Sequence, residues 1–578
     1  MSDNNNKLIN DAVNKIFAAF EDYNHEFRHI TRRAHRRFEE REWKLGQRDA
    51  IERIELYDHR VVGCLAGLVG LMGAHIADQK IWRQVRDQYS KRIADCTDSE
   101  FYKTFFNSLT RKAFNTVGVN AEVEFLAPDL EPTLNGSDPP LHSYQNEGSL
   151  APIIESILEQ FPSARLFKDF ARTTRFVVDE LYAYSQVYHR GKPIRSIEML
   201  VPVFYRATRA FLVGRIQGDD WIAPFILAFK NGDDGIVVDA VITSNREVRS
   251  LFGFSRSYLH VDLPAVGAAV KFLRSFMPKK GVDELYTSLG RAKQGKTERY
   301  RRLYKHLTVS TDKFIHAEGQ RGMVMIVFTL PSYDLVFKVI RDRFAFPKTT
   351  SRADVMERYQ YVFKHDRVGR LVDAQEFRQL RFSRSRFSAE LLAELREEAG
   401  QACRVERDDL IIEHCYIERR LRPLNLYLQE VNEMAAGQAV VDYGQAIKDL
   451  ARSNVFPGDL LLKNFGVTDN GRIIFYDYDE LCLVTDCSFR ELPSARFEED
   501  ETRGEPWFYV GQYDVFPEQF ANFLGLPEQL RDIFLKYHHD LLTADYWRSL
   551  KSSHDADKLL EVVPYADRSV APSQNLVN

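Results

Sequence analysis

Three polar residues near the C-terminal end of the sequence have the spacing of a phosphoryl-transfer site. Asp459 and Asn464 are five residues apart in the segment PGDLLLKN, and Asp477 follows Asn464 by thirteen residues in FYDYDE. Phosphoryl transfer needs a carboxylate that accepts or orients the proton of the attacking hydroxyl group, and oxygen ligands that hold Mg²⁺ against the phosphates. We therefore predict Asp459 as the base, and Asn464 and Asp477 as metal ligands. The alternative is that GDLLLKN is a turn and DYDE is a strand end with solvated acids.

A second acid, Asp479, stands beside Asp477. Between Asn464 and Asp477 the turn signal Asp469-Asn470-Gly471 predicts a hairpin of two short strands, which would return Asp477 to the side of Asn464. Residues two apart on a strand share a face. We therefore expect Asp479 beside Asp477, where Asp477 or Asp479 can act as a catalytic acid that orients a water molecule.

The nucleotide end of this site is predicted further upstream. Residues 313–340 predict three strands, at 313–316, 323–330 and 335–340, with a Pro-Ser-Tyr-Asp turn between the last two. Between the first two lies AEGQRGM, in which Gly319 and Gly322 lack a Cβ atom. Such glycines let the backbone approach a phosphate and direct amide groups at it. A plain hairpin turn is the alternative.

Lys338 is the residue that strengthens this interpretation. It follows Gly322 by sixteen residues in VFKVI, a strand otherwise made of apolar residues. A buried lysine is costly unless an anion meets it, and protein kinases place their phosphate-binding lysine in such a third strand. The alternative is a lysine that reaches solvent at a sheet edge. Glu357 and Glu376 are the acids that we consider as its partner, and the sequence does not decide between them.

The elements that position these residues belong to a multidomain chain. A length of 578 residues predicts about two to four domains. Hydrophobic residues make up 44% and charged residues 28%, which is the composition of a globular protein rather than a disordered one. The net charge of -4 and a pI near 6.5 argue against nucleic acid or an anionic membrane as the main partner.

The N-terminal half predicts a different structure from the C-terminal half. Residues 10–108 have helical patterning, and residues 127–148 are rich in Pro, Asn, Ser and Gly, which predicts an exposed connection. Two apolar runs around the turn signal NGDDG predict a hairpin between residues 221 and 243. We place the domain boundary near residue 310, which gives an N-terminal domain at 1–310 and a catalytic domain at 311–578.

The most apolar segment and the cysteines both favour a cytoplasmic protein. Residues 61–74 are too short for a membrane span and predict a buried core helix. The start of the chain lacks the basic and then apolar order of a secretion signal. The six cysteines show no CxxC pair and no zinc-ligand spacing, so we expect reduced thiols.

The C-terminal segments resemble protein kinases, with departures. The strand-like run LIIEHCYIERR leads into a proline, as a kinase's fifth strand leads into the hinge between its lobes, and a helix at about 438–453 precedes the PGD segment. Pro457-Gly458 replaces the usual His-Arg, Tyr478-Asp479 replaces Phe-Gly, and no Ala-Pro-Glu segment follows. We therefore do not expect an ordinary phosphorylation-controlled activation loop.

Five segments carry a resemblance to one family, the bacterial isocitrate dehydrogenase kinase/phosphatases. They are AEGQRGMVM, VFKVIRDRF, KHDRVGRLVDAQEF, YIERRLRPLN and the block from FPGDLLLKNFGVT to FYDYDE. YDHR near residue 58, FFNS near 105 and FGFSRSY near 253 extend the resemblance over nearly the whole chain. The resemblance implies an α+β protein in which a mainly helical regulatory domain precedes a bilobal protein-kinase-like domain.

The resemblance also implies activities and ligands. One active site would phosphorylate a serine of isocitrate dehydrogenase with ATP and Mg²⁺ and, with a bound adenine nucleotide such as ADP, remove that phosphate. This controls the branch between the citric acid cycle and the glyoxylate bypass. AMP would be an allosteric effector. The family match adds Asp373 as a catalytic residue. It also assigns nucleotide binding to Ala317, Glu318, Gly319, Gln320, Arg321, Gly322, Met323 and Lys338.

Two other functions remain open from the residues alone. A small-molecule kinase of the aminoglycoside or choline type also uses a catalytic loop that begins with Gly-Asp. A nucleotide-binding regulatory scaffold would bind ATP without turnover. The acidic and aromatic stretch at 497–510 can either grip a protein substrate or be an ordinary exposed loop. We expect no nucleic-acid or membrane partner, and a homodimer is an option that the sequence leaves open.

Overall fold

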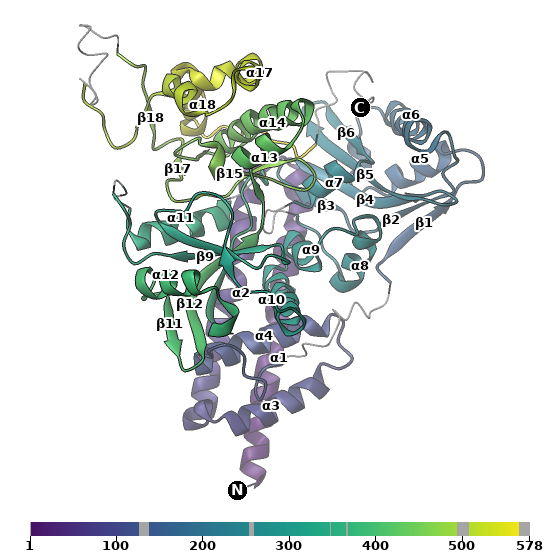
Figure 1. Cartoon of the computed structure of the whole chain (residues 1–578). Coiled ribbons are helices and arrows are strands. Elements are labelled where there is room, and N and C mark those ends of the chain that lie inside the picture. Colours follow the sequence, from purple (N-terminus) through teal and green to yellow (C-terminus); the bar gives the residue numbers. More distant parts are fainter. Residues whose placement is uncertain are drawn as a thin grey trace.

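The computed structural model describes residues 2–125, 138–253, 259–346, 348, 350–365, 368–493 and 508–565. Within them the chain forms an N-terminal part of helices and one sheet, followed by a two-lobed part (Figure 1). The predicted fold class, a mainly helical domain followed by a bilobal kinase-like domain, is confirmed. Half of the predicted connection at 127–148, part of FGFSRSY and most of the stretch at 497–510 lie outside the described residues.

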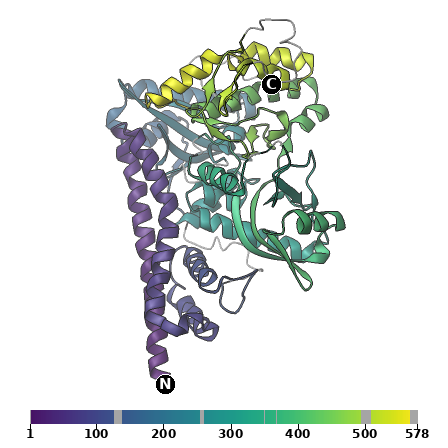
Figure 2. The same cartoon turned by 90° about the vertical axis from the view of Figure 1, so that its left-hand side faces the viewer.

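The first helices form a long antiparallel hairpin along one side of the molecule, drawn in purple in Figure 2. In the first helix, apolar residues recur every three or four positions, and Ile9, Ile16 and Phe20 are almost fully buried. This spacing puts them on one helix face, which packs on the second helix and on the two that follow. The four are α1 (Ser2–Glu39), α2 (Trp43–Met72), α3 (Gln79–Arg92) and α4 (Ser99–Phe114).

The apolar segment at 61–74 lies in α2 and is buried on one face only. Val61 and Leu68 belong to the core, but Val62 is 55% and Val69 is 49% exposed. The expectation of a buried core helix was therefore wrong for half of this segment. By length and composition alone, the segment Trp43–Ala77 is long and apolar enough to cross a membrane. Of its most apolar stretch of 18 residues, 22% is buried inside the protein.

A six-stranded antiparallel sheet forms the second layer of the N-terminal part. Its order is β1-β2-β4-β5-β6, with β3 paired to β4, and the predicted NGDDG hairpin joins β5 to β6. Successive residues of β4 point to opposite faces, so Leu212 packs toward α5 and α6 while Phe211 packs toward α7 and α8. The strands are β1 (Leu141–Gln145), β2 (Ser196–Leu200), β3 (Phe204–Arg206), β4 (Arg209–Gln217), β5 (Ile222–Gly232) and β6 (Gly235–Ile242). The helices are α5 (Ala151–Glu159), α6 (Phe170–His189), α7 (Asn245–Leu251), α8 (Val266–Phe276), α9 (Val282–Ser288) and α10 (Ala292–Val309).

The smaller lobe of the C-terminal part is an antiparallel sheet with two helices. Its order is β10-β12-β9-β8-β7, and β11 pairs with β12. The three strands predicted at 313–340 are present. A capping box begins the helix α11, because the Ser351 and Asp354 side chains each accept the other's backbone N–H. The elements are β7 (Ile315–His316), β8 (Met325–Thr329), β9 (Leu335–Ile340), α11 (Arg352–His365), β10 (Gln375–Ser383), α12 (Ala389–Glu398), β11 (Cys403–Glu406) and β12 (Asp409–Arg419).

The larger lobe is mainly helical and carries the PGD segment. Its core gathers residues of α14, α17 and α18 around the small β13-β15-β16 sheet. The hairpin predicted around Asp469-Asn470-Gly471 joins β15 to β16. The elements are β13 (Arg422–Pro423), α13 (Leu424–Glu430), α14 (Glu433–Arg452), β14 (Val455–Phe456), β15 (Phe465–Val467), β16 (Ile473–Phe475), β17 (Cys482–Leu483), β18 (Ser488–Phe489), β19 (Asp514–Val515), α16 (Phe520–Phe523), α17 (Glu528–His538) and α18 (Ala544–Asp555).

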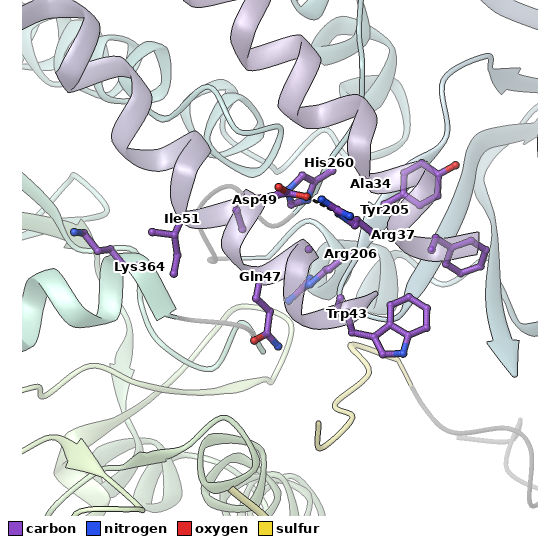
Figure 3. A pocket seen from close by; sticks show the side chains of 14 residues that line it. Ala34, Arg37, Trp43, Gln47, Asp49, Ile51, Tyr205, Arg206, His260 and Lys364 are labelled. Atoms are coloured by element: carbon purple, nitrogen blue, oxygen red, sulfur yellow. Dashed lines mark hydrogen bonds and ion pairs between the residues drawn. The ribbon is translucent and has the colours of Figure 1, made fainter. Parts of the chain in front are cut away.

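The helical hairpin reaches the smaller lobe beside a small cavity of about 60 Å³ (Figure 3). Arg37 of α1 and Asp49 of α2 form an ion pair of 3.0 Å at its wall. On another side Lys364, from α11, pairs with Glu55 of α2 at 2.6 Å. The helix α11 is therefore held between its own lobe and the N-terminal part of the chain.

Candidate active site

The loop after β14 presents Asp459 at the edge of the larger lobe. Gly458 before it has φ of +88°, and a Cβ atom there would lie 2.6 Å from the Cβ atom of Glu480. Only glycine fits this turn without displacing its neighbour. The Asp459 carboxylate accepts hydrogen bonds from the backbone N–H of Leu461, at 3.2 Å, and from the side-chain amide of Asn464. The local sequence therefore fixes the direction of the predicted base.

The hairpin β15–β16 brings Asp477 back to this loop, as the turn signal predicted. The backbone N–H of Tyr476 donates to the carbonyl oxygen of Asn464 at 3.1 Å, so Asp477 begins directly beside the asparagine. Burial raises the pKa of Asp459, and the charges of Glu480 and Asp477 raise it further, against the hydrogen bond from Leu461. The carboxylates thus lie close enough to repel one another.

Asp479 lies in the same cluster, but the strand expected under it is absent. Residues 476–478 have no regular secondary structure, and the side chain of Tyr478 is fully buried, where its hydroxyl donates to the carbonyl oxygen of Val372 at 2.8 Å. Asp477 and Asp479 therefore flank a buried tyrosine rather than sharing a strand face. Burial, and then the charge of Asp477, raise the pKa of Asp479 to about 7. The positive charges of Lys348 and Lys338 oppose this rise but do not cancel it.

These carboxylates suit a divalent cation. Oxygen ligands and excess negative charge are what Mg²⁺ requires, and Mg²⁺ usually takes only one or two protein ligands and completes its shell with water and phosphate. In the described part of the chain no group of three or more His, Cys, Asp or Glu side chains is arranged to hold a metal by itself. Asn464 and Asp477 together fit the incomplete, phosphate-dependent kind of site.

The glycine loop lies between the hinge and the PGD loop. Gly319 has φ of +112°, which an L side chain rarely adopts, and a Cβ atom on Gly322 would lie 2.9 Å from the carbonyl oxygen of Met325. Gln320 accepts a hydrogen bond from Lys463 of the larger lobe at 3.3 Å, and Glu318 pairs with Arg422 at the hinge. The loop from Ala317 to Met323 therefore contacts both the larger lobe and the hinge, and Glu318 to Met323 are exposed.

Lys338 is buried and meets an acid that the sequence did not suggest. Its Nζ lies 2.7 Å from Oε1 of Glu418 on the hinge strand β12, and donates to the carbonyl oxygen of Tyr476 at 2.7 Å. Neither Glu357 nor Glu376 is the partner of Lys338, so both candidates were wrong. Glu357 is exposed, and Glu376 pairs with His414 at 3.2 Å. Lys338 thus connects the small sheet to the residue before Asp477.

The register of the sheet explains this pairing. Tyr416 lies opposite Lys338 in the β12–β9 pair, which makes Glu418 the diagonal neighbour on the same face. Glu418 is 2% exposed, and burial raises the pKa of its carboxyl group against the lowering by Lys338. The signal in the sequence was the acid of YIERR, at the end of a strand that is mostly buried.

Asp373 lies two residues before β10, the strand that pairs with β12. It is buried, accepts a hydrogen bond from Gln375 Nε2 at 2.9 Å, and its Oδ2 lies 3.5 Å from Nη2 of Arg299 in α10. The backbone N–H of Val372, beside it, donates to Phe475 of β16 at 3.2 Å. Its catalytic role stays a prediction.

Arg299 of the N-terminal part contacts both Asp373 and the strand β12. Its Nε donates to Asp283 of α9 at 3.0 Å, and its Nη1 lies 3.4 Å from the carbonyl oxygen of Ile417, next to Glu418. Burial lowers the pKa of Arg299, but the charges of Asp283 and Asp373 outweigh it, and the net pKa is raised. Arg299 is therefore positively charged, and it contacts both Asp373 and the strand that carries Glu418.

We expect Arg299→Ala to lower the catalytic efficiency of phosphate transfer by roughly 10- to 100-fold, because small displacements of positioning groups have effects of this size. Arg302→Ala is the matched control. Arg302 lies one turn further along α10, also pairs with Asp283 at 2.8 Å, and is 46% exposed. Initial-rate measurements well below both melting temperatures should leave Arg302→Ala within about threefold of wild type. Equal losses in the two variants would contradict a specific role for Arg299.

The chain is similar to proteins of one family over most of its length. The family model described as the isocitrate dehydrogenase kinase/phosphatase (AceK) kinase domain matches residues 312–567, and the model of the regulatory domain of the same family matches residues 13–311. The isocitrate dehydrogenase kinase/phosphatase of Anaeromyxobacter sp. (strain Fw109-5) is 46% identical over 552 residues, which is 96% of each chain. That of Xanthomonas campestris pv. campestris (strain 8004) is 46% identical over 556 residues, again 96% of each chain. Among solved structures, the ROP18 kinase domain in complex with AMP-PNP and sucrose aligns at 12% identity and a TM-score of 0.21, over 44% of this chain and 90% of that one.

Proposed function

Because the chain belongs to the isocitrate dehydrogenase kinase/phosphatase family, we propose that it phosphorylates a serine of isocitrate dehydrogenase with ATP and removes the same phosphate at the same site. The observation that carries the proposal is that Lys338 of the smaller lobe donates to Tyr476 of the larger lobe, the residue before Asp477, whose charge acts on Asp459. The physiological consequence is control of flux between the citric acid cycle and the glyoxylate bypass.

The residues have separate roles in the transfer. Asp459, which is half-buried, accepts or orients the proton of the serine hydroxyl group as it attacks. Lys338 is held by Glu418 in the position from which its ammonium group binds the phosphates of the nucleotide. The backbone amides of the loop from Ala317 to Met323 contact the same phosphates. Asn464 and Asp477 would hold Mg²⁺, which would supply positive charge to the transferred phosphoryl group.

The reverse reaction uses a water molecule in place of the serine. With ADP in the nucleotide groove, a carboxylate beside the phosphoserine must orient the water and accept its proton. Asp479 fits this role because burial and Asp477 raise its pKa toward neutrality, where a base is most useful. Asp373 is the further family-based proposal.

The direct test uses purified protein, ATP with radioactive γ-phosphate, Mg²⁺ and isocitrate dehydrogenase. We expect label on one serine of the dehydrogenase, and loss of that label after ATP is replaced by ADP. Transfer to aminoglycosides or choline but not to the protein would support a small-molecule kinase instead. Nucleotide binding without any transfer would support a regulatory scaffold and overturn the proposal.

Asp479→Asn separates the two activities. We expect it to lower hydrolysis of phosphorylated isocitrate dehydrogenase by roughly 10²-fold, because the amide cannot accept the proton of water. The forward transfer should stay within about tenfold, since Asp459 serves the serine. Glu480→Gln is the matched control, because Glu480 is the next acid in sequence and is exposed. Hydrolysis at the wild-type rate in Asp479→Asn would remove Asp479 from the mechanism.

Further proposals concern AMP, the location of the protein and its other partners. AMP is proposed as an allosteric effector that acts through the contacts between the N-terminal part and the catalytic lobes, of which Arg299 is one. A cytoplasmic location fits the six free cysteines. A second copy of the chain is a proposed partner, for which the exposed Val62 and Val69 of α2 provide apolar surface. The net charge of -4 supports the expectation that nucleic acid and anionic membranes are not partners.

A further inference from the structure

Two cysteines lie close together just beyond the predicted metal ligand Asp477. The Sγ atoms of Cys482 and Cys487 are 3.5 Å apart, although four residues separate them in sequence. Both are free thiols. The backbone of Cys482 pairs with Phe456 of β14, which lies three residues before Asp459. The thiol pair is therefore attached to the loop that presents the base.

A tight turn holds the two sulfur atoms in this position. The backbone N–H of Cys487 donates to the carbonyl oxygen of Val484 at 3.2 Å, and Val484 is fully buried. Asn454 Oδ1 accepts the backbone N–H of Thr485 at 3.1 Å, and Lys551 Nζ donates to the carbonyl oxygen of Cys487 at 2.7 Å. The geometry of the pair is thus fixed from both sides of the turn.

The two thiols have different environments. Cys482 is half-buried, whereas Cys487 is 1% exposed. Either thiol can donate the hydrogen bond between them, and the Cys487 thiol also donates to the carbonyl oxygen of Leu483 at 3.3 Å. The contact between the two sulfur atoms lowers the pKa of Cys482 and raises that of Cys487. A thiolate is the form that reacts with oxidants. Cys482 therefore has the properties of an attacking thiol and Cys487 those of a protected, resolving thiol.

The other four cysteines lack this combination. Burial raises the pKa of Cys64 and of Cys403 to about 12 in each case, and it also raises the pKa of Cys415. Cys96 is half-buried. It is consequently the natural reference thiol for accessibility.

We propose that Cys482 and Cys487 form a site of reversible oxidation by peroxides, and that the resulting disulfide slows phosphate transfer. The Cys482 thiolate attacks one oxygen of hydrogen peroxide, the O–O bond breaks and hydroxide leaves, which gives a sulfenic acid. The Cys487 sulfur then attacks the Cys482 sulfur, and the oxygen leaves as water with the thiol proton. Peroxide is reduced to two water molecules, two thiols are oxidised to one disulfide, and a dithiol reductant reverses the change.

The effect on transfer follows from the geometry of the bond. A disulfide needs its sulfur atoms about 2.05 Å apart, so the pair must close by more than an ångström from its present 3.5 Å. Cys487 is fixed by Val484 and Lys551, so the movement falls mainly on β17 and on its partner Phe456. We expect a several-fold fall in the transfer rate, because Asp459 follows Phe456 so closely.

The experiment uses the full chain, reduced and then treated with hydrogen peroxide. No Lys or Arg lies between Ile473 and Arg490, so trypsin leaves both cysteines in one peptide. We expect that peptide to lose the mass of two hydrogen atoms and to resist alkylation until dithiothreitol is added. Cys487→Ser should instead leave Cys482 as a sulfenic acid that dimedone traps, and Cys96→Ser should behave as wild type.

Each outcome decides one part of the proposal. Oxidation of Cys482 no faster than that of Cys96, or sulfinic acid in place of the disulfide, would overturn the oxidation site. A complete disulfide with an unchanged transfer rate would overturn its effect on Asp459. The rate measurement rests on the proposed kinase activity, whereas the mass measurement does not. An inactive reduced protein that still forms the disulfide would therefore count against the proposed function alone.

Discussion

Replacing Asp459 with Asn will lower phosphate transfer to isocitrate dehydrogenase by about 10²- to 10⁴-fold, the range that a positioned base contributes. The amide keeps the shape of the carboxylate and can still accept the hydrogen bond from Leu461. It cannot accept the proton of the serine hydroxyl group. The binding of ADP, measured by calorimetry, should change little because Lys338 and the glycine loop are untouched.

The same substitution should not destabilise the protein. The Asp459 carboxyl group carries a pKa raised by burial and by Glu480 and Asp477, so in the metal-free protein its charge is unfavourable. Removing that charge should hold or increase the melting temperature, a pattern typical of residues kept for function. Asp545→Asn, at a side chain that is 90% exposed, is the control for the chemical change itself. A lower melting temperature together with wild-type transfer would contradict both halves of the prediction.

The residues around Asp459 could be predicted because their signals are local. The spacing from Asp459 to Asn464, the turn at Asp469-Asn470-Gly471 and the following acid lie within one short stretch, and the backbone there has few alternatives. Gly458 adds a turn that only glycine fits. The glycine loop and its three strands were likewise predicted from a single continuous segment.

The contacts that the sequence could not supply are those between distant segments. Glu418 meets Lys338 because β12 lies beside β9 in one particular register, and no local pattern states that register. Arg299 meets Asp373 because α10 of the N-terminal part packs against the catalytic sheet. Cys482 and Cys487 approach because the turn between them is tied down at Asn454 and Lys551. Spacing alone did not reveal any of these three pairs.

The exposed face of α2 was mispredicted for a related reason. Val62 and Val69 are as apolar as Val61 and Leu68, so composition alone does not tell which side of the helix meets the core. The helices α1 and α4 pack against α2, and Val62 and Val69 stay exposed. Which face is covered depends on packing that a local window does not contain.

Lys338→Met should remove phosphate transfer and also destabilise the protein, for two separable reasons. Transfer is lost because the ammonium group no longer binds the phosphates, and we expect a fall of about 10²-fold or more. Stability falls because Glu418, 2% exposed, is left as a buried charge without its ion pair. Breaking such a buried pair costs about 3–5 kcal/mol of unfolding free energy, which urea denaturation can measure.

A second substitution distinguishes the two effects. In the double variant Lys338→Met with Glu418→Leu, no charge remains at the site, so most of the lost stability should return while transfer stays absent. The Glu418→Leu variant by itself leaves Lys338 buried and unpaired, and should lose both stability and transfer. A double variant as unstable as Lys338→Met would show that the deficit comes from packing rather than from the charge of Glu418.

The pH dependence provides an independent check on the charge of Glu418. Burial raises the pKa of this carboxyl group, and Lys338 is the main influence that opposes the rise, so in Lys338→Met the folded pKa should be higher still. Below the ordinary Glu pKa of about 4.3 the group is neutral in both the folded and unfolded states, and its burial then costs little. The difference in unfolding free energy between Lys338→Met and the double variant should therefore be small at low pH. It should grow as the pH rises from the ordinary Glu pKa to the raised pKa of the folded state, because the folded state then holds a proton that the unfolded state has released. Above the raised pKa it should level off, because both states are then charged. A difference that stays constant with pH would exclude the charge of Glu418 as its cause.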